Sequence, residues 1–232
     1  MSFLNGEAVA SGTDVLGARP GDHVVLFYQD DDGLAGRVSE YLLEAIQKDG
    51  AAIVIATPDQ RLLFERRLTQ AGVDIAAAQV SGSYLALDAS ETMRRFIVAD
   101  WADPASFWQA ISPLIRQATG TRQPVRIYGE MVALLWDDGL VNAAIEVEAM
   151  WNELGGQYLF SLLCAYPAQS VSGSRHLDAL AEVCRAHAVA VDVPPEPGEA
   201  RPGRFINHQY GQRERDGHAA TPHTITSCCC ST

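Results

Sequence analysis

The chain has 232 residues, of which 47% are hydrophobic and 20% charged, so it is long and apolar enough for one large globular domain or two small ones. Its 29 acidic and 17 basic residues leave a net charge of −12. That charge argues against a nucleic-acid or anionic-membrane surface, because such surfaces need clustered positive charge. Lys48 is the only lysine, which excludes a phosphate-loop lysine or a Schiff-base lysine anywhere else.

Residues 1–14 form a mixed leader with neither a positive stretch nor an apolar run, so they do not have the pattern of a signal peptide. No stretch of the chain approaches the roughly 18 apolar residues that a membrane-spanning helix needs. We therefore expect a cytoplasmic protein with no membrane partner.

Short apolar segments alternate along the chain with segments of helical periodicity. The first strand is predicted at 23–28, and the helix that follows at 34–48 ends at Asp49-Gly50. Strands that alternate with helices imply a mostly parallel sheet covered by helices on both faces, so the predicted fold class is α/β. The further elements, in chain order, are strand 51–57, helix 58–71, strand 84–88, helix 90–99, helix 106–119, strand 125–128, helix 140–154, strand 158–165, helix 176–188 and strand 189–193.

The composition changes abruptly after residue 193. Residues 194–232 hold five of the eleven prolines and three of the five cysteines, but no Leu, Val, Met or Trp. Four arginines balance four acids there, so the whole net charge of −12 belongs to the preceding part of the chain. Such a segment cannot bury enough apolar surface to offset its ordering entropy. The sequence predicts one α/β domain over 15–193 and a disordered tail over 194–232 that ends in a Ser/Thr/Cys cluster.

Ligands of open α/β sheets bind at the carboxyl ends of the strands. In this chain those ends carry Tyr28, Asp88, Glu130, Cys164 and Tyr166 as candidate ligand-binding residues. Glu130 is the strongest candidate, because it follows an apolar strand and a glycine, where burial raises a carboxyl pKa. It would serve as a ligand-binding carboxylate or a general base, and the structural alternative is a helix cap or an ion pair with an arginine. Cys164 is expected to be a small buried residue, although its place near this edge also suits a redox-sensitive thiol.

Other patterns argue against particular kinds of functional site. His23 begins the first strand, at the end opposite the predicted ligand edge, so we expect it to be structural or solvent-exposed. The segment 28–37, where a phosphate loop would lie, has three consecutive acids and neither GxxxxGK[ST] nor GxGxxG. GxSxG, HExxH and CxxC are also absent from the chain. We therefore predict no catalytic residue, metal site or cofactor for the domain, and no nucleotide hydrolysis.

Several segments, taken in order, resemble the MEDS family, the methanogen/methylotroph DcmR sensory domain. The resemblance covers roughly residues 15–190 and is specific as an ordered succession. It implies a RecA/KaiC-like three-layer sandwich without a phosphate loop, and a sensory module for small ligands. The matching segments are DHVVLFY at 22–28, AIVIATP at 52–58, RIYGEMV at 126–132, ALLW at 133–136, the helical segment with Trp-Asn at 146–154 and SLLCAYP at 161–167.

Members of this family often occur beside histidine kinase, anti-sigma kinase-like or DNA-binding domains. No kinase-like or helix-turn-helix region follows the MEDS-like part here, so we expect output through a partner protein, through a homo-oligomer or through the tail. The implied partner is a kinase, an anti-sigma factor or a transcription regulator, with no direct contact to nucleic acid. The sequence thus predicts a non-catalytic sensory or regulatory module that binds a small ligand. A small-molecule enzyme that uses Glu130 as its base is an alternative.

The end of the tail supports several hypotheses. Cys228, Cys229 and Cys230 with His223 would suit a soft-metal site, although consecutive cysteines alternate in direction and rarely bind one ion together. Prenylation of Cys229 is a second hypothesis, but the aliphatic pair expected after it is missing. A third is the heterocyclised or dehydrated core of a ribosomally made modified peptide, with the domain as its leader. A tail without a function is the remaining alternative.

Overall fold

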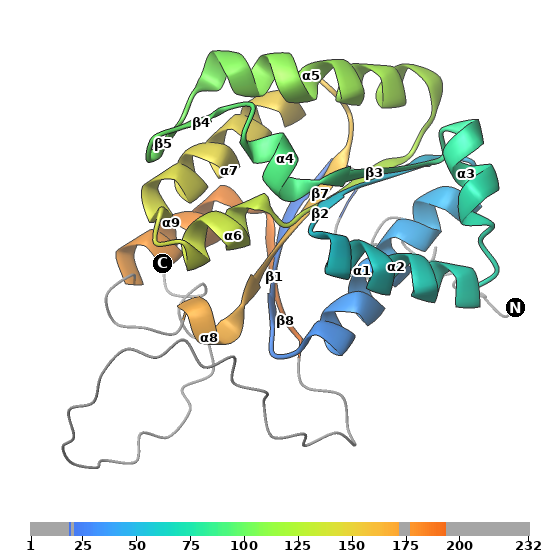
Figure 1. The fold of residues 1–232 in the computed structure, drawn as a ribbon, viewed down its shortest axis with the longest axis horizontal. Coiled ribbons are helices and arrows are strands. Elements are labelled where there is room, and N and C mark those ends of the chain that lie inside the picture. The colour runs from blue at the N-terminus through green and yellow to red at the C-terminus, as the bar shows by residue number, and fades with distance from the viewer. Residues whose placement is uncertain (1–18, 20, 172–176, 194–232) are drawn as a thin grey trace, which may run out of the picture.

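The computed structural model describes residues 19, 21–171 and 177–193 (Figure 1). They contain a six-stranded parallel sheet with the strand order β3-β2-β6-β7-β1-β8. Each strand coincides with or overlaps a segment predicted as a strand, so the predicted α/β sheet is confirmed. The strands are β1 (His23–Tyr28), β2 (Ala51–Ala56), β3 (Tyr84–Asp88), β6 (Val125–Gly129), β7 (Ser161–Pro167) and β8 (Val189–Val193).

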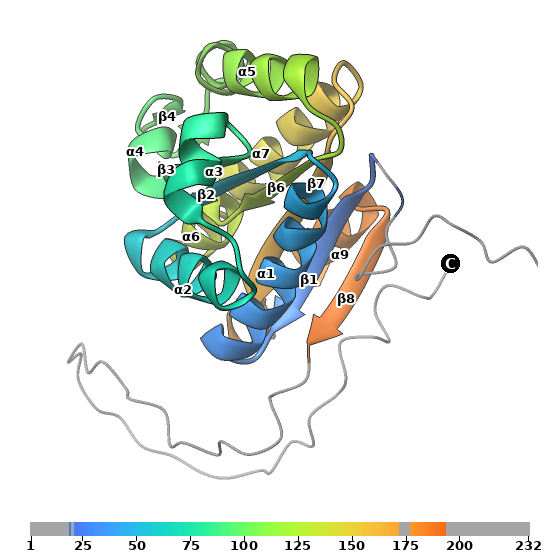
Figure 2. The same cartoon turned by 90° about the vertical axis from the view of Figure 1, so that its right-hand side faces the viewer.

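Helices cover both faces of this sheet and make a three-layer sandwich (Figures 1 and 2). One face carries α1 (Asp31–Gln47), α2 (Pro58–Gln70) and α3 (Ile75–Ser81). The other face carries α4 (Ala89–Met93), α5 (Pro104–Thr121), α6 (Met131–Asp137), α7 (Val141–Gly155), α8 (Ala168–Val171) and α9 (Leu177–Ala186). Among the helices of the described segments, none combines the length and the apolar character that crossing a bilayer requires.

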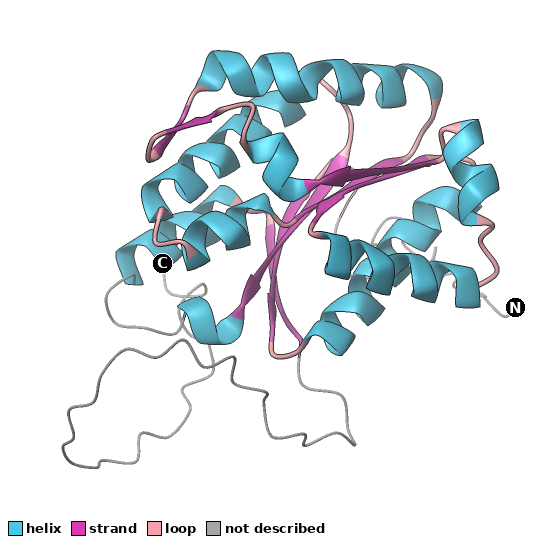
Figure 3. Ribbon diagram, in the orientation of Figure 1, coloured by secondary structure: helices cyan, strands magenta, loops and turns pink. Residues whose placement is uncertain are grey.

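Side chains alternate between the two faces of the sheet and build two separate hydrophobic cores. Each core lies between the strands and one of the two helical layers, whose backbones Figure 3 shows on either side of the sheet. Along β1, Val25 and Phe27 pack in the core under α4–α9, while Val24 and Leu26 pack in the core under α1–α3. Every residue of β1 and β2 is buried. This burial on both faces explains why these strands are continuous apolar runs rather than alternating polar and apolar residues.

The structure differs from the predicted helix at 90–99. Helix α4 ends at Met93, and the chain continues into a short antiparallel pair formed by β4 (Ile97–Val98) and β5 (Trp101–Ala102). Ala99 lies in the turn between them with a positive φ of 54°. Because Ile97 and Val98 are β-branched, the extended pair suits them better than another helical turn does.

Three short helices, α3, α6 and α8, have no counterpart among the predicted elements. Helix α6 directly follows β6, and most of its residues are buried, so it lacks the polar face that makes a helix visible in a sequence. Helix α3 has only one buried residue, Ala78. It is bounded by Asp74, whose carboxylate accepts a hydrogen bond from Ala77 N (3.0 Å), and by Gly82 with a φ of 74°.

Gly50 lies where the α1–β2 connection touches the segment before β6. A Cβ atom added there would lie 2.1 Å from the backbone oxygen of Pro124 and 2.9 Å from that of Ala45. We predict that Gly50→Ala lowers the free energy of unfolding by about 3 kcal/mol, because the backbone must move to make room. Urea denaturation measures this change.

Gly120 provides the matched control for this substitution. It lies in α5, and a Cβ added there meets no atom within 4 Å. Gly120→Ala is expected to leave the stability unchanged or to raise it by up to about 1 kcal/mol, because alanine favours a helix. An equal loss in both variants would contradict the close backbone approach at Gly50.

Candidate functional site

The carboxyl ends of β1, β2, β3 and β6 bring together a first set of polar side chains, which we call the edge group: Tyr28, Thr57, Asp88 and Glu130. Glu130 is 7% exposed. Its Oε2 accepts a hydrogen bond from Thr57 N (2.5 Å), and its Oε1 accepts one from Thr57 Oγ1 (3.3 Å). Burial raises the pKa of Glu130, the two Thr57 hydrogen bonds oppose this, and the carboxylates of Asp31 and Asp88 raise it further. Glu130 is therefore an oriented carboxyl with an elevated pKa.

Tyr28 and Asp88 contribute differently to the edge group. Burial, together with the charges of Asp31 and Glu130, raises the pKa of the Tyr28 phenol, so this group stays protonated and is available as a donor. Asp88 accepts a hydrogen bond from Glu91 N (2.9 Å) and thereby caps α4. Its other carboxylate oxygen lies 3.7 Å from the Arg61 guanidinium. Asp88 thus stabilises a helix start as well as lining the edge.

Cys164 and Tyr166 are not part of the edge group, although the sequence places all five candidates at one edge. Both side chains leave β7 toward α7, where they contact Glu148. The Cys164 thiol lies 3.3 Å from Glu148 Oε2, and the Tyr166 hydroxyl donates to Glu148 Oε1 at 2.8 Å. The structure therefore divides the predicted candidates between two locations.

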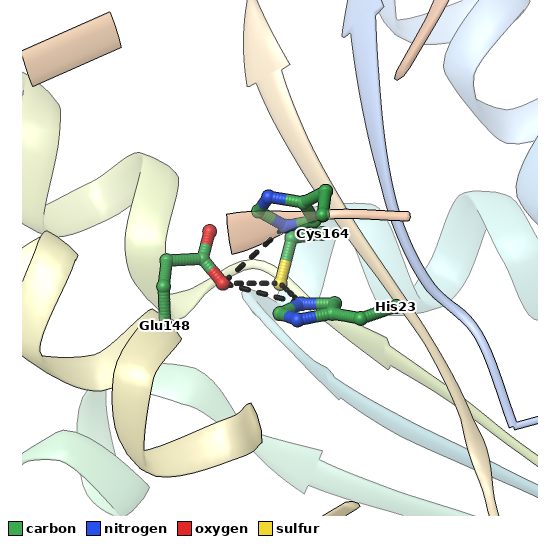
Figure 4. Close-up of side chains that lie close together, drawn as sticks. His23, Glu148 and Cys164 are labelled. Atoms are coloured by element: carbon green, nitrogen blue, oxygen red, sulfur yellow. Dashed lines mark hydrogen bonds and ion pairs between the residues drawn. The ribbon is translucent and has the colours of Figure 1, made fainter. Parts of the chain in front are cut away.

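The second location is the buried cluster of His23, Glu148, Cys164 and His187, three of which are labelled in Figure 4. Glu148 Oε2 lies 3.2 Å from His23 Nε2, 3.5 Å from His187 Nε2 and 3.3 Å from Cys164 Sγ. His23 Nε2 also lies 3.3 Å from Cys164 Sγ. All four residues are buried, and these four atoms lie within 4.8 Å of one another.

Each member of the buried cluster comes from a different element. His23 begins β1, Glu148 lies on α7, Cys164 lies within β7, and His187 precedes β8. The parallel pairing of β1 with both β7 and β8 brings these distant segments together. Ala188 N donates to His23 O at 2.8 Å, and the ring centroids of the two histidines are 4.0 Å apart.

Both imidazole rings are held by hydrogen bonds on the side away from Glu148. His23 Nδ1 lies 2.9 Å from Asn152 Oδ1, and His187 Nδ1 lies 2.6 Å from the Val183 carbonyl oxygen. The amide nitrogen of Asn152 donates to Ala186 O at 3.0 Å, which leaves its oxygen facing His23. Because these oxygens accept hydrogen bonds, each Nδ1 carries a proton, and each Nε2 faces the cluster.

Glu148 is the charged centre of the cluster. Burial alone would raise its pKa, but the imidazoles of His187 and His23 together hold it well below its ordinary value. Burial would lower the pKa of His187, but the Glu148 carboxylate outweighs this effect and raises it. Burial and the same carboxylate raise the pKa of the Cys164 thiol and the Tyr166 phenol, which therefore stay protonated.

A hollow of about 200 Å³ opens beside the buried cluster, lined in part by His23, Trp151, Asn152 and Leu162. It lies at the amino end of β1 and reaches one side of the His23 ring. Another hollow, of about 670 Å³, is lined by residues such as Tyr84 and belongs to neither group of polar side chains.

Sequence reasoning identified only part of the buried cluster. His23, expected to be structural or solvent-exposed, is buried among polar partners. Glu148 and His187 had not been singled out. The available signal was Glu148 itself, a charge on the helix face that also carries the buried residues Ala144 and Trp151. The tail candidates Cys228, Cys229 and Cys230 lie outside the described residues.

Comparison with protein families places the whole domain in one of them. The model described as MEDS, MEthanogen/methylotroph, DcmR Sensory domain, matches residues 22–188. This range includes both the edge group and the buried cluster. None of the curated proteins matches the chain in sequence.

Two of the solved structures that align with this chain are from Pyrococcus horikoshii. An uncharacterized protein, solved in complex with an unknown peptide, aligns with a TM-score of 0.57 at 12% sequence identity, over 76% of this chain and 78% of that chain. A KaiC-like protein from strain OT3 aligns with a TM-score of 0.43 at 13% identity, over 65% of this chain and 64% of that chain. The first alignment shows a shared fold.

The Glu148–His187 pair makes the stability of the protein depend on pH. The folded-state pKa of His187 is raised above its ordinary value of 6.5, so the resulting stabilisation is complete below pH 6.5 and is lost as the pH rises through the folded-state pKa. In Glu148→Gln the carboxylate no longer raises the His187 pKa, and burial lowers it against the Val183 hydrogen bond alone, so the variant loses less stability than the wild type as the pH rises. The difference in free energy of unfolding between the wild type and Glu148→Gln should therefore narrow as the pH rises.

Urea midpoints measured across the neutral range, with a chelator present, provide this test. Both proteins share every other titrating group, so the difference between their midpoints reports on the cluster. A difference that stays constant with pH would show that Glu148 does not control the proton on His187.

Proposed function

The chain belongs to the MEDS family of sensory domains, and from this premise we propose that it is a non-catalytic sensory or regulatory module that binds a small ligand and signals through a partner protein. The observation that supports ligand binding most directly is Glu130, a buried carboxyl with a raised pKa at the carboxyl ends of the strands. Open α/β sheets bind their ligands at this edge. Tyr28 adds a protonated phenol in the same electrostatic environment.

The charges around Glu130 favour a small amine over a phosphate. Asp30 accepts a hydrogen bond from Gly33 N at 2.7 Å, so the start of α1 already has an acidic partner where a phosphate would bind. Burial raises the pKa of Glu130 most, and the carboxylates of Asp31 and Asp88 raise it further, so these two charges make the potential at Glu130 more negative. An ammonium group would donate hydrogen bonds to Glu130 and gain from this potential.

Glu130 also offers a route from the ligand to both helical layers. Its carboxyl holds the backbone N–H of Thr57, the residue before α2, and its own backbone precedes α6. Helices α2 and α6 cover opposite faces of the sheet (Figure 2). A ligand that competes for the Glu130 carboxyl would release Thr57 and change the start of α2, so binding would alter the surface offered to a partner.

The same proposal includes the partner classes that the family implies: a kinase, an anti-sigma factor or a transcription regulator. It also includes a cytoplasmic location and a homo-oligomer. The Pyrococcus horikoshii protein that shares this fold was solved with an unknown peptide. That observation supports a polypeptide surface as the kind of partner that such a fold accommodates.

Replacement of Glu130 tests the proposed ligand site. Thermal unfolding of the full chain would be measured with a panel of small primary and quaternary amines, and with inorganic phosphate as the comparison. We predict that at least one amine raises the melting temperature and phosphate does not. Glu130→Gln should weaken amine binding at least about tenfold, a loss of about 1.4 kcal/mol, while keeping an oxygen that can accept from Thr57.

Glu91→Gln is the matched control, because it removes one carboxylate close to the same edge from a side chain that is 68% exposed. It should bind the amine as the wild type does. Undiminished binding in Glu130→Gln would remove Glu130 from the site. Mass spectrometry of the bound amine separates the sensor from the enzyme alternative, since the sensor releases its ligand unchanged.

A further inference from the structure

We propose that the buried cluster of His23, Glu148, Cys164 and His187 is a zinc-binding site. It is separate from the edge group, and the proposal does not depend on what Glu130 binds. Imidazole nitrogen, thiolate sulfur and carboxylate oxygen are the three kinds of ligand atom that bind Zn²⁺ in proteins. The fold brings four such side chains together from β1, α7, β7 and the connection between α9 and β8.

The distances within the cluster match the edges of a tetrahedron. Metal–ligand distances of about 2.0–2.3 Å place tetrahedral ligand atoms about 3.3–3.7 Å apart. Four of the six separations between the ligand atoms are 3.2–3.5 Å. Three of them join Glu148 Oε2 to the other ligand atoms, and the fourth joins His23 Nε2 to Cys164 Sγ. The other two pairs both involve His187 and lie within 4.8 Å, so the His187 nitrogen is the ligand atom whose spacing is least defined.

The protonation of the two imidazoles prepares them as ligands. Each ring donates its Nδ1–H to an oxygen, Asn152 Oδ1 for His23 and the Val183 carbonyl for His187. When the ring is neutral, its Nε2 then presents a lone pair to the cluster. Tyr166 likewise fixes the carboxylate by donating to Glu148 Oε1, the oxygen that does not face the histidines. Such outer hydrogen bonds are the usual support of metal ligands.

His187 supplies an independent observation. Its side chain is 0% exposed, and its Nε2 makes no hydrogen bond with any group in the described part of the chain. It lies 3.5 Å from Glu148 Oε2 without hydrogen-bond geometry. Leaving a buried polar nitrogen without a hydrogen bond is costly, and the ion pair with Glu148 offsets this cost only when the ring is protonated, so the neutral ring needs another partner inside the cluster. A metal ion bound there would provide one.

The charges of the four ligands suit a buried divalent cation. One thiolate, one carboxylate and two neutral imidazoles carry two negative charges, so the complex with Zn²⁺ is neutral overall. This balance matters because an unbalanced charge in such a dry environment would be strongly unfavourable. Binding releases the proton of the Cys164 thiol, since a coordinating thiol is deprotonated, and it also releases the Nε2 proton of His187 from molecules in which that ring is protonated.

The ligand set selects the class of ion and the kind of site. Mg²⁺ and Ca²⁺ prefer oxygen ligands alone, whereas a mixed N, S and O set suits zinc. Four protein ligands leave no open position, which is typical of a structural site rather than a catalytic one. The hollow at the amino end of β1 is lined by one of the four ligands, His23. Bound zinc would join β1, α7 and β7 to the α9–β8 connection, so occupancy would control how firmly β8 is held.

Cobalt titration of the full-length chain tests the proposal. The protein would carry Cys228→Ser, Cys229→Ser and Cys230→Ser, so that the tail thiols cannot bind metal. We expect one equivalent of Co²⁺ to bind, with the intense visible bands of a tetrahedral site and a thiolate-to-cobalt band in the near ultraviolet. One equivalent of Zn²⁺ should displace it and raise the melting temperature. The absence of stoichiometric binding, or a spectrum without the thiolate band, would overturn the proposal.

Variants of the ligands and their supports sharpen the test. Cys164→Ser, which changes little volume, should remove the thiolate band, and Glu148→Gln should weaken binding by more than about 100-fold. Asn152→Ala removes the support of His23 together with the hydrogen bond to Ala186 O, leaves all four ligands in place and should weaken binding about 10–100-fold. Glu153→Gln, an exposed carboxylate on the same helix, should bind as the parent does. An unchanged thiolate band in Cys164→Ser would also overturn the proposal, and that variant is decisive even if Glu148→Gln fails to fold.

Discussion

A carboxylate buried between the sheet and α7 constrains the architecture around it. Glu148 is 1% exposed, so the cost of removing its charge from water must be offset by groups in the same layer. Its partners are His23 on β1, Cys164 and Tyr166 on β7, and His187 before β8. Glu148 therefore helps to fix the edge strand β8, which is otherwise held in the sheet by its pairing with β1.

Strand β1 connects the two groups of polar side chains. It begins at His23, in the buried cluster, and ends at Tyr28, in the edge group. Six extended residues span about 17 Å, so the groups lie at opposite ends of one rigid strand. In our proposals, a metal ion would hold the amino end of β1 while a ligand binds near its carboxyl end. A single structural element would then be in contact with both.

The strands were predictable because their burial on both faces leaves a continuous apolar run in the sequence, as at Ala51–Ala56. Helices without a polar face, such as α6, left no such pattern. The edge group was largely predictable, because parallel strands bring their carboxyl ends to one side. The buried cluster was not, since it depends on which face of β7 carries Cys164 and on a pairing between segments more than 140 residues apart in sequence. The family resemblance was confirmed but does not identify either site.

Native-state hydrogen exchange tests the role of Glu148 most directly. We predict that Glu148→Gln speeds amide exchange in β8 and α9 much more than in β2 and β3, because β8 and α9 flank His187 while β2 and β3 pair with neither β7 nor β1. Equal acceleration in all strands, or no change in β8, would contradict the claim that this buried carboxylate holds the edge of the sheet in place.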